Sequence, residues 1–331
     1  MKKSVVGGIA AAALALLAAG AARTQPAQPN LADLEKLGAR IAAKLAQACP
    51  MAARDDVDAH AKCAAALRTS DEVPMASSGI LWGGDQPELR LSKRKLTHFK
   101  PDIFRQVYLS LFSFTGQWSA SIDPRERVGV ISVQAYFRNA LPPGEFPYPF
   151  WHSADKWSAY ETANVIRFYF NREGQVFVVT RSKDGSEANR GTWAHVTPPT
   201  FTDWQWSDPA GGLQPHATLF SNRYSAGNPH LVALDKAYRD FAAEARKGTC
   251  LTCHAPNNEA GMDHLVLLQT PVHASGEIDD VLEEVRSGKM PQDDLGMRKP
   301  LPADLRAAIL RTGGEFKREL DAADQWEAAR H

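Results

Sequence analysis

The feature that most constrains this chain is the pentapeptide CLTCH at residues 250–254. Two cysteines that are separated by two residues and followed directly by histidine form the attachment signature of c-type haem. Each thiol adds to a vinyl group of the porphyrin, and the histidine is then placed to bind the iron. The sequence therefore predicts one covalent haem c, attached through Cys250 and Cys253, with His254 as an iron ligand.

Two other uses of a C-x-x-C pair fit this sequence less well. Half of a zinc site needs a second ligand pair at a related spacing, whereas Cys49 and Cys63 lie far upstream with a different spacing. A thioredoxin-like redox pair is expected beside a βαβ pattern, and no such pattern surrounds residue 250. Haem attachment is therefore the preferred interpretation.

The N-terminus has the pattern of a secretory signal peptide over residues 1–22. Lys2 and Lys3 form the charged start, an apolar run follows from Val5 to Ala18, and small residues supply a cleavage site at 19–21. The alternative is an uncleaved anchor, for which the run is barely long enough. We expect cleavage, and hence a periplasmic protein that keeps no transmembrane span.

Export also accounts for the remaining cysteines. The chain has four cysteines, and haem attachment uses two of them. An oxidising compartment permits disulfides, so we predict a structural disulfide between Cys49 and Cys63.

The charge balance argues against two classes of partner. Lys and Arg number 38, Asp and Glu also number 38, and no long basic run occurs. Nothing in the sequence therefore favours binding to nucleic acid or to a membrane surface. The expected partner is a redox protein or a small electron donor or acceptor.

Residue patterns divide the 331-residue chain into several parts and predict a multidomain α+β fold. The expected parts are a helical N-terminal segment at 23–77, a β-rich domain at 78–206, a linker at 207–230 and an all-α haem domain at 231–331. In the first part, Asn30–Ala48 and Asp55–Leu67 have helical patterns, with Asn30 as an N-cap. We expect these helices to form a hairpin pinned by Cys49–Cys63.

The β-rich prediction depends on alternation and turn signals. Apolar and polar residues alternate in Arg127–Arg138, and two further strand patterns, Asn164–Phe170 and Gln175–Ser182, flank an Asn-Arg-Glu-Gly turn at 171–174. A short helix is expected at Ser153–Ala163. Seven of the eight tryptophans fall in this domain, and His152 and His195 each lie close to one of them. These pairs line a pocket or, as is more common for aromatic residues, belong to the core.

Three helical patterns follow the linker. The first covers Leu234–Arg246 and leads into the C-x-x-C-H motif. The second is expected to begin with Ser275 as its cap and to stop at Gly288. The third begins near Asp304, and a Lys-Met-Pro sequence at 289–291 separates it from the second.

This order of helix, C-x-x-C-H, helix, Gly-x-Met-Pro and helix resembles a class I mono-haem cytochrome c domain over about residues 231–320. The resemblance implies that the first and last helices cross beside the haem, with an aromatic residue at the crossing. Tyr238 or Phe241 against Leu310 would be the local equivalent. The pair Gly313-Gly314 is expected to break the last helix, which departs from the family pattern. Residues 30–230 show no such resemblance.

The resemblance further implies His254 as the proximal iron ligand and Met290 as the distal one. A thioether suits iron in its lower oxidation state, and His/Met ligation raises the reduction potential. His273 is the main rival and would give a bis-histidine haem. The other competitors are Met262, His264 and Met297.

Three functions remain open at the level of sequence. The preferred one is one-electron transfer by an exported c-type cytochrome. The alternatives are a haem-c oxidoreductase, whose β-rich domain or open haem site acts on a small molecule, and a haem-based redox sensor. Haem enzymes of the cytochrome P460 type also place C-x-x-C-H after a β-rich region, but they lack the methionine loop and the helical tail.

Overall fold

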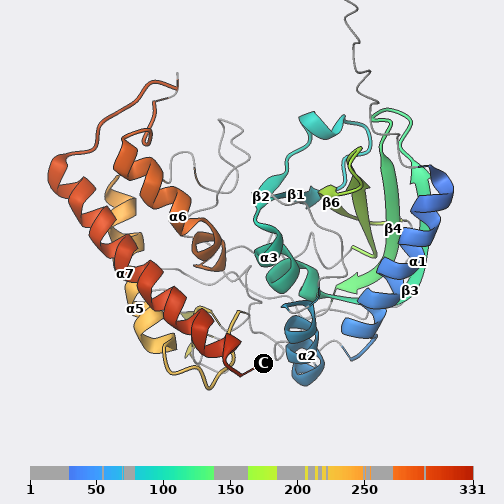
Figure 1. Ribbon diagram of the computed structural model, residues 1–331, viewed down its shortest axis with the longest axis horizontal. Coiled ribbons are helices and arrows are strands. Elements are labelled where there is room, and N and C mark those ends of the chain that lie inside the picture. The colour runs from blue at the N-terminus through green and yellow to red at the C-terminus, as the bar shows by residue number, and fades with distance from the viewer. Residues whose placement is uncertain are drawn as a thin grey trace, which may run out of the picture.

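The structure of the chain, a computed structural model, describes residues 30–53, 56–68, 70, 79–137, 163–184, 206–207, 213–214, 218–220, 223–248, 250, 254, 271–293 and 296–330. It is a mixed α and β protein, in which a six-stranded sheet lies on one side and three long helices on the other (Figure 1). The predicted signal peptide, Cys253, and the helix expected at Ser153–Ala163, apart from its last residue, lie outside the described residues. So do His152 and His195.

The N-terminal helices form close to the places that the sequence predicts. Helix α1 spans Leu31–Ala48, and the side chain of Asn30 accepts a hydrogen bond of 2.8 Å from the backbone N–H of Asp33, as an N-cap does. Helix α2 spans Val57–Arg68. The apolar stripe of α1, which includes Ile41, is buried against strands β3 (Phe112–Ile122) and β4 (Gly129–Phe137) (Figure 1).

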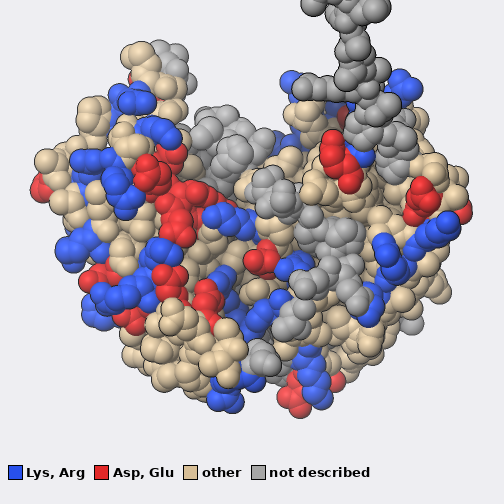
Figure 2. Space-filling view, in the orientation of Figure 1, with Lys and Arg blue, Asp and Glu red and all other residues tan. Residues whose placement is uncertain are grey.

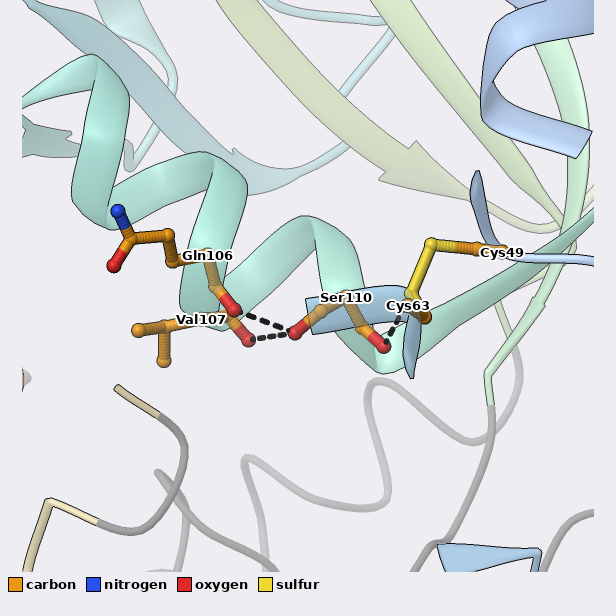
Figure 3. Close-up of a disulfide and its surroundings, with 5 residues drawn as sticks. All are labelled: Cys49, Cys63, Gln106, Val107 and Ser110. Carbon is orange, nitrogen blue, oxygen red and sulfur yellow. Dashed lines mark hydrogen bonds between the residues drawn. A yellow bond between two sulfur atoms is a disulfide. The ribbon is translucent and has the colours of Figure 1, made fainter. Parts of the chain in front are cut away.

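The disulfide that the cysteine count predicts joins the end of α1 to α2. Cys49 and Cys63 are both fully buried. The Cys63 sulfur lies 3.6 Å from the carbonyl oxygen of Ser110, whose hydroxyl donates to the carbonyls of Gln106 and Val107 (Figure 3). The disulfide thus joins the two helices of the hairpin and packs against the segment that leads into the sheet.

The sheet has the order β2-β1-β6-β5-β4-β3. Its strands are β1 (Ile80–Gly84), β2 (Thr97–Phe99), β3 (Phe112–Ile122), β4 (Gly129–Phe137), β5 (Val165–Phe170) and β6 (Val176–Ser182). All neighbours are antiparallel except β1 and β6, which are parallel. The predicted turn at 171–174 is present, since the Asn171 and Gln175 backbones pair across it at 2.9 Å. A second, two-stranded sheet pairs β7 (Trp206–Ser207) with β8 (Leu213–Gln214).

A helical segment of changing pitch connects β2 to β3. Its parts are α3 (Pro101–Ile103), the π-helical η2 (Phe104–Tyr108) and the 3₁₀ turn η3 (Leu109–Leu111), and a further 3₁₀ turn, η1 (Leu91–Lys93), precedes β2. Trp82 of β1 packs against Phe104 and Phe112, with ring centroids 5.1 Å and 6.3 Å apart. These rings join the segment to the core of the sheet.

Three helices form the C-terminal part: α5 (Leu231–Lys247), α6 (Pro271–Ser287) and α7 (Ala303–Ala328). On the face shown in Figure 2, their acidic and basic side chains are interspersed, in keeping with the balanced charge of the chain. Among the described residues, none of the helices combines the length and the apolar character needed to cross a bilayer.

Two sequence-based expectations about these helices are wrong. Helix α6 begins at Pro271, so Ser275 lies inside it, where its hydroxyl donates to the Val272 carbonyl at 2.6 Å instead of capping the helix. Helix α7 continues through Gly313-Gly314 without a break. A Cβ atom on Gly313 would lie 2.8 Å from Leu282 and 3.3 Å from Phe241, so close packing against both neighbours accounts for this glycine.

Residues of the predicted linker contribute to the C-terminal core. Leu219, Phe220 and Tyr224 are buried, and Phe220 contacts Tyr238 and Phe316 at centroid distances of 5.8 Å and 6.0 Å. The packing of the C-terminal helices therefore includes residues from before α5.

Replacing both Cys49 and Cys63 by serine should lower the free energy of unfolding by about 3 kcal/mol, because the cross-link closes a short loop in the unfolded chain. Urea unfolding of the double variant and of the oxidised wild type measures the difference. In the oxidised wild type, neither cysteine should react with iodoacetamide under denaturing conditions until a reductant is added. Equal stability of the two proteins, or labelling of Cys49 without reduction, would contradict this expectation.

Candidate functional site

The beginning of the C-x-x-C-H motif lies just beyond the end of α5. Helix α5 ends at Lys247, and the N–H of the C-cap residue Gly248 donates to the Ala245 carbonyl at 3.0 Å. Cys250 is half-buried and packs against the buried apolar cluster. A Cβ atom on Gly248 would be 3.4 Å from both the Cys250 sulfur and the Ile309 Cδ1, so these two side chains flank the end of α5. The Cys250 thiol therefore lies beside α7.

The backbones of Cys250 and His254 lie close together. The N–H of His254 donates to the Cys250 carbonyl at 2.9 Å. The residue predicted to form the first thioether and the predicted proximal ligand are therefore neighbours in space, while Cys253 lies outside the described residues.

Helices α5 and α7 pack together through aromatic rings. Phe241 stacks on Phe316 with centroids 5.9 Å apart and an interplanar angle of 13°, and Tyr238 meets Phe316 at 5.4 Å. On α7, both rings contact Phe316. Leu310, with which one of them is expected to pair, is partly buried and packs against the same cluster, so that pairing stays a prediction. Close approach at Gly313 lets the Phe241 ring lie against the α7 backbone.

Met290 follows directly after the end of α6. Gly288 has a φ of 67°, and the N–H groups of Lys289 and Met290 both donate to the Glu284 carbonyl, at 3.0 Å and 3.3 Å. This is the left-handed helix ending that glycine favours, at the residue that the sequence predicts. The Met290 side chain is half-buried, whereas the competing Met297 is 62% exposed.

The loop that carries Met290 is held at both ends. The N–H of Lys299 donates to the Pro291 carbonyl at 2.8 Å, which closes the loop on itself. Arg306 of α7 donates from Nε to the Val285 carbonyl at 3.1 Å and from its guanidinium to the Arg286 carbonyl. A cation is favourable at the C-terminal end of a helix. These bonds fix the end of α6 relative to α7, and with it the position of Met290.

His273, the rival ligand, lies in the first turn of α6 between the two halves of the molecule. Its side chain is 2% exposed and stacks on Phe99 of β2 at a centroid distance of 4.2 Å. Its Nε2 is 3.0 Å from the carbonyl oxygen of His98. The structure therefore gives His273 a role in packing α6 against the sheet. The other competitors, Met262 and His264, lie outside the described residues.

A buried carboxyl group lies one turn further along α6. Glu277 is 8% exposed. Burial raises the pKa of its carboxyl to about 7; Lys100 opposes this shift, while the neighbouring Asp280 contributes to it. Lys100, which begins the helical segment after β2, forms an ion pair of 3.1 Å with Asp280. The contact between α6 and the sheet half thus includes a group that titrates near neutral pH.

The side chains described here fit a c-type haem. A half-buried thiol, an imidazole four residues further along the chain and a half-buried thioether are the side-chain types that attach haem c and bind its iron. Among the described residues, no three His, Cys, Asp or Glu side chains gather as they would around a bare metal ion. Haem differs from such a site, because its porphyrin supplies the equatorial ligands.

A pocket that the sequence patterns do not predict lies in the sheet half. It has a volume of about 440 Å³ and is lined by Arg167, Arg181 and Lys183, among others. In the sequence, Arg181 and Lys183 follow the apolar residues of a predicted strand, which indicates that charged side chains lie where this strand ends. Nothing local indicates that Arg167 lies beside them.

No family model matches this chain, and comparison with curated proteins and with solved structures likewise finds no match. Any functional conclusion therefore depends on the residues of this chain.

Replacing Glu277 by glutamine should make the free energy of unfolding less dependent on pH. From the ordinary glutamate pKa of about 4.3 up to about 7, the folded protein keeps a proton that the unfolded chain releases. Wild-type stability therefore falls as the pH rises through this window, and the loss is complete above it. At about pH 8 the free energy of unfolding of the variant should exceed that of the wild type by about 1–2 kcal/mol, after allowance for screening by water.

Urea unfolding at about pH 5 and about pH 8 tests this expectation. Glu283→Gln, on the exposed side of the same helix, is the matched control and should change little at either pH. If Glu277→Gln shifts the stability equally at both pH values, the carboxyl does not titrate in this range.

Proposed function

We propose that this chain is an exported c-type cytochrome that carries one covalent haem and transfers single electrons. Cys250 and Cys253 would attach the haem, with His254 as the proximal iron ligand and Met290 as the distal one. The observation that carries the proposal is the C-x-x-C-H motif, whose first and last residues are joined by a backbone hydrogen bond beside α7. The haem supplies a metal that accepts and releases one electron.

The packing of the C-terminal helices supports a cytochrome c-like domain in this part of the chain. Helices α5 and α7 meet through Phe241 and Phe316, and α6 joins them at Gly313. In a class I cytochrome c, the first and last helices also cross beside the haem. We therefore infer an all-α haem domain over residues 231–331, preceded by a β-rich domain and by the disulfide-pinned helical hairpin.

The residues of this chain would perform three tasks in electron transfer. Cys250 and Cys253 hold the cofactor covalently, so that it stays bound in both oxidation states. The apolar cluster against which Cys250 packs excludes water from its surroundings. The bonds from Arg306 to the end of α6 hold Met290 in place, and a preorganised ligand needs little rearrangement when an electron is exchanged.

The disulfide supports the proposed location. Cys49 and Cys63 are joined in the structure, and such bonds persist mainly in oxidising compartments, including the bacterial periplasm. Together with the N-terminal sequence pattern, this favours a periplasmic protein.

A second function is favoured by one observation. The pocket lined by Arg167, Arg181 and Lys183 lies in the sheet half, away from the proposed haem domain. A haem-c oxidoreductase or a redox sensor would use such a pocket to bind a small molecule. Binding of carbon monoxide to the reduced wild type separates these functions from simple electron transfer, because electron transfer needs no open position on the iron.

Replacing Met290 by alanine should open the distal position of the iron. The oxidised wild type should show the weak near-red absorption band of sulfur-to-iron charge transfer, and carbon monoxide should leave the reduced spectrum unchanged. The variant should lose this band and bind carbon monoxide.

Met297→Ala is the matched control, since this exposed methionine lies in the same loop. It should behave like the wild type. If the Met290 variant keeps the band, Met290 is not the ligand. If the wild type itself binds carbon monoxide readily, the iron is open and an enzyme or a sensor becomes the better proposal.

Replacing both Cys250 and Cys253 by serine should abolish covalent attachment, since no thiol then remains to form a thioether. Haem staining of a denaturing gel measures the attached haem directly. The single variants should each lose most of the stain, and Cys49→Ser with Cys63→Ser should keep it. Full retention of haem after denaturation of the Cys250 and Cys253 double variant would refute the attachment.

A further inference from the structure

Strand β3 forms one edge of the six-stranded sheet, and part of this edge is open (Figure 1). A β-bulge interrupts the pairing with β4 between Phe114 and Trp118. Before the bulge the edge is covered, because the N–H of Phe114 donates to the Cys49 carbonyl at 2.9 Å. After the bulge, β3 pairs with β4 without interruption from Trp118 to Ile122. We call residues 118–122 the open edge.

The hydrogen-bond pattern shows which backbone groups of the open edge point away from the sheet. The N–H of Asp123 donates to the Val128 carbonyl at 2.9 Å, in register with the pairs of β3 and β4. Since hydrogen-bonded and non-bonded pairs alternate in an antiparallel ladder, residues with odd numbers bond to β4. The N–H and C=O groups of Trp118, Ala120 and Ile122 therefore point outward. No hydrogen bond to another described residue uses these outward groups.

The residues of β3 provide none of the usual protection of a sheet edge. Its sequence, FSFTGQWSASI, contains no charged residue and no proline. Natural edge strands commonly use both to prevent pairing with another chain. In addition, the apolar side chain of Ile122 is 41% exposed. The open edge is therefore suited to receive another strand.

The opposite edge of the sheet is less suited to such pairing. Strand β2 has only three residues, and the carbonyl oxygen of its His98 lies 3.0 Å from Nε2 of His273 in α6. Pairing between the two different edges would build an open chain of molecules, whereas pairing of one edge with itself closes after two copies. The sheet thus offers one edge for association, and that edge can only pair with its own kind or with a foreign strand.

We propose that the open edge of β3 pairs antiparallel with the open edge of a second copy of this chain, which forms a two-fold symmetric dimer with one continuous sheet. If Ala120 lies opposite Ala120 of the second copy, Trp118 lies opposite Ile122 of that copy. In this register every outward residue faces another outward residue, so each pair can exchange two backbone hydrogen bonds. The edge is therefore complementary to itself, as a closed dimer requires.

The side chains of the open edge also match in this register. On the face covered by α1, where Trp118 packs against Gly38, the indole of one copy would meet Ile122 of the other. Aromatic residues opposite β-branched residues stabilise a strand pair. On the other face, the exposed Ser119 would lie opposite the exposed Ser121, and two hydroxyls can hydrogen-bond. The proposal goes beyond electron transfer and does not depend on the haem.

Sedimentation equilibrium of the full-length holoprotein tests the proposal. We expect a monomer–dimer equilibrium with a Kd in the micromolar range. Ser119→Lys combined with Ser121→Lys places like charges opposite each other across the interface, and should raise this Kd at least about tenfold. Both serines are exposed, so the monomer should keep its fold. Ala303→Lys combined with Ala307→Lys adds the same charge at exposed positions of α7 and is the matched control, which should dimerise as the wild type does.

A second variant tests the backbone pairing itself. Ala120→Pro removes an N–H that points away from β4, and an edge strand tolerates proline at such a position. It should also raise the Kd for dimerisation, and circular dichroism of each variant checks the fold. A wild type that stays monomeric up to about 100 µM would overturn the proposal. Equal dimerisation of the wild type and the double-lysine variant would overturn it too, because the dimer would then use another surface.

Discussion

The close packing of helix α6 on two sides holds the two halves of this molecule together. On one side, Gly276 brings its backbone against Ile103, where an added Cβ would be 2.7 Å from that side chain. On the other side, Leu282 packs against Gly313 of α7. Close approach at these two glycines lets α6 lie between the sheet half and helices α5 and α7, as Figure 1 shows. A larger residue at either position would require the facing side chain to shift.

This arrangement makes α6 the connection between the sheet half and the loop that carries Met290. The first turns of α6 contact the sheet half through His273 and the neighbourhood of Glu277, and its last turn leads to Met290. One rigid helix therefore connects the predicted distal ligand with the edge of the sheet that carries β2. The same helix contributes a carboxyl whose pKa lies near neutrality.

Much of the fold could be predicted because its signals are local. Asn30 caps α1, Gly288 ends α6, and the turn at 171–174 joins two strands, since each depends on bonds between residues close in sequence. The pairing of Cys49 with Cys63 followed from counting the cysteines that haem attachment leaves over. Of the proposed haem site, the sequence supplies the identity of the residues, and the structure adds the backbone hydrogen bond between Cys250 and His254.

The sequence by itself determined the chemistry of the motif and the positions of most helices and strands, because those depend on residue type and near neighbours. Only the tertiary structure decided that Gly313 continues a helix, since its reason is the contact with Leu282 and Phe241. It also decided that His273 stacks on Phe99 and that Arg167 joins Arg181 at one pocket. These partners lie far apart in the chain, and no local pattern encodes which distant surfaces will meet.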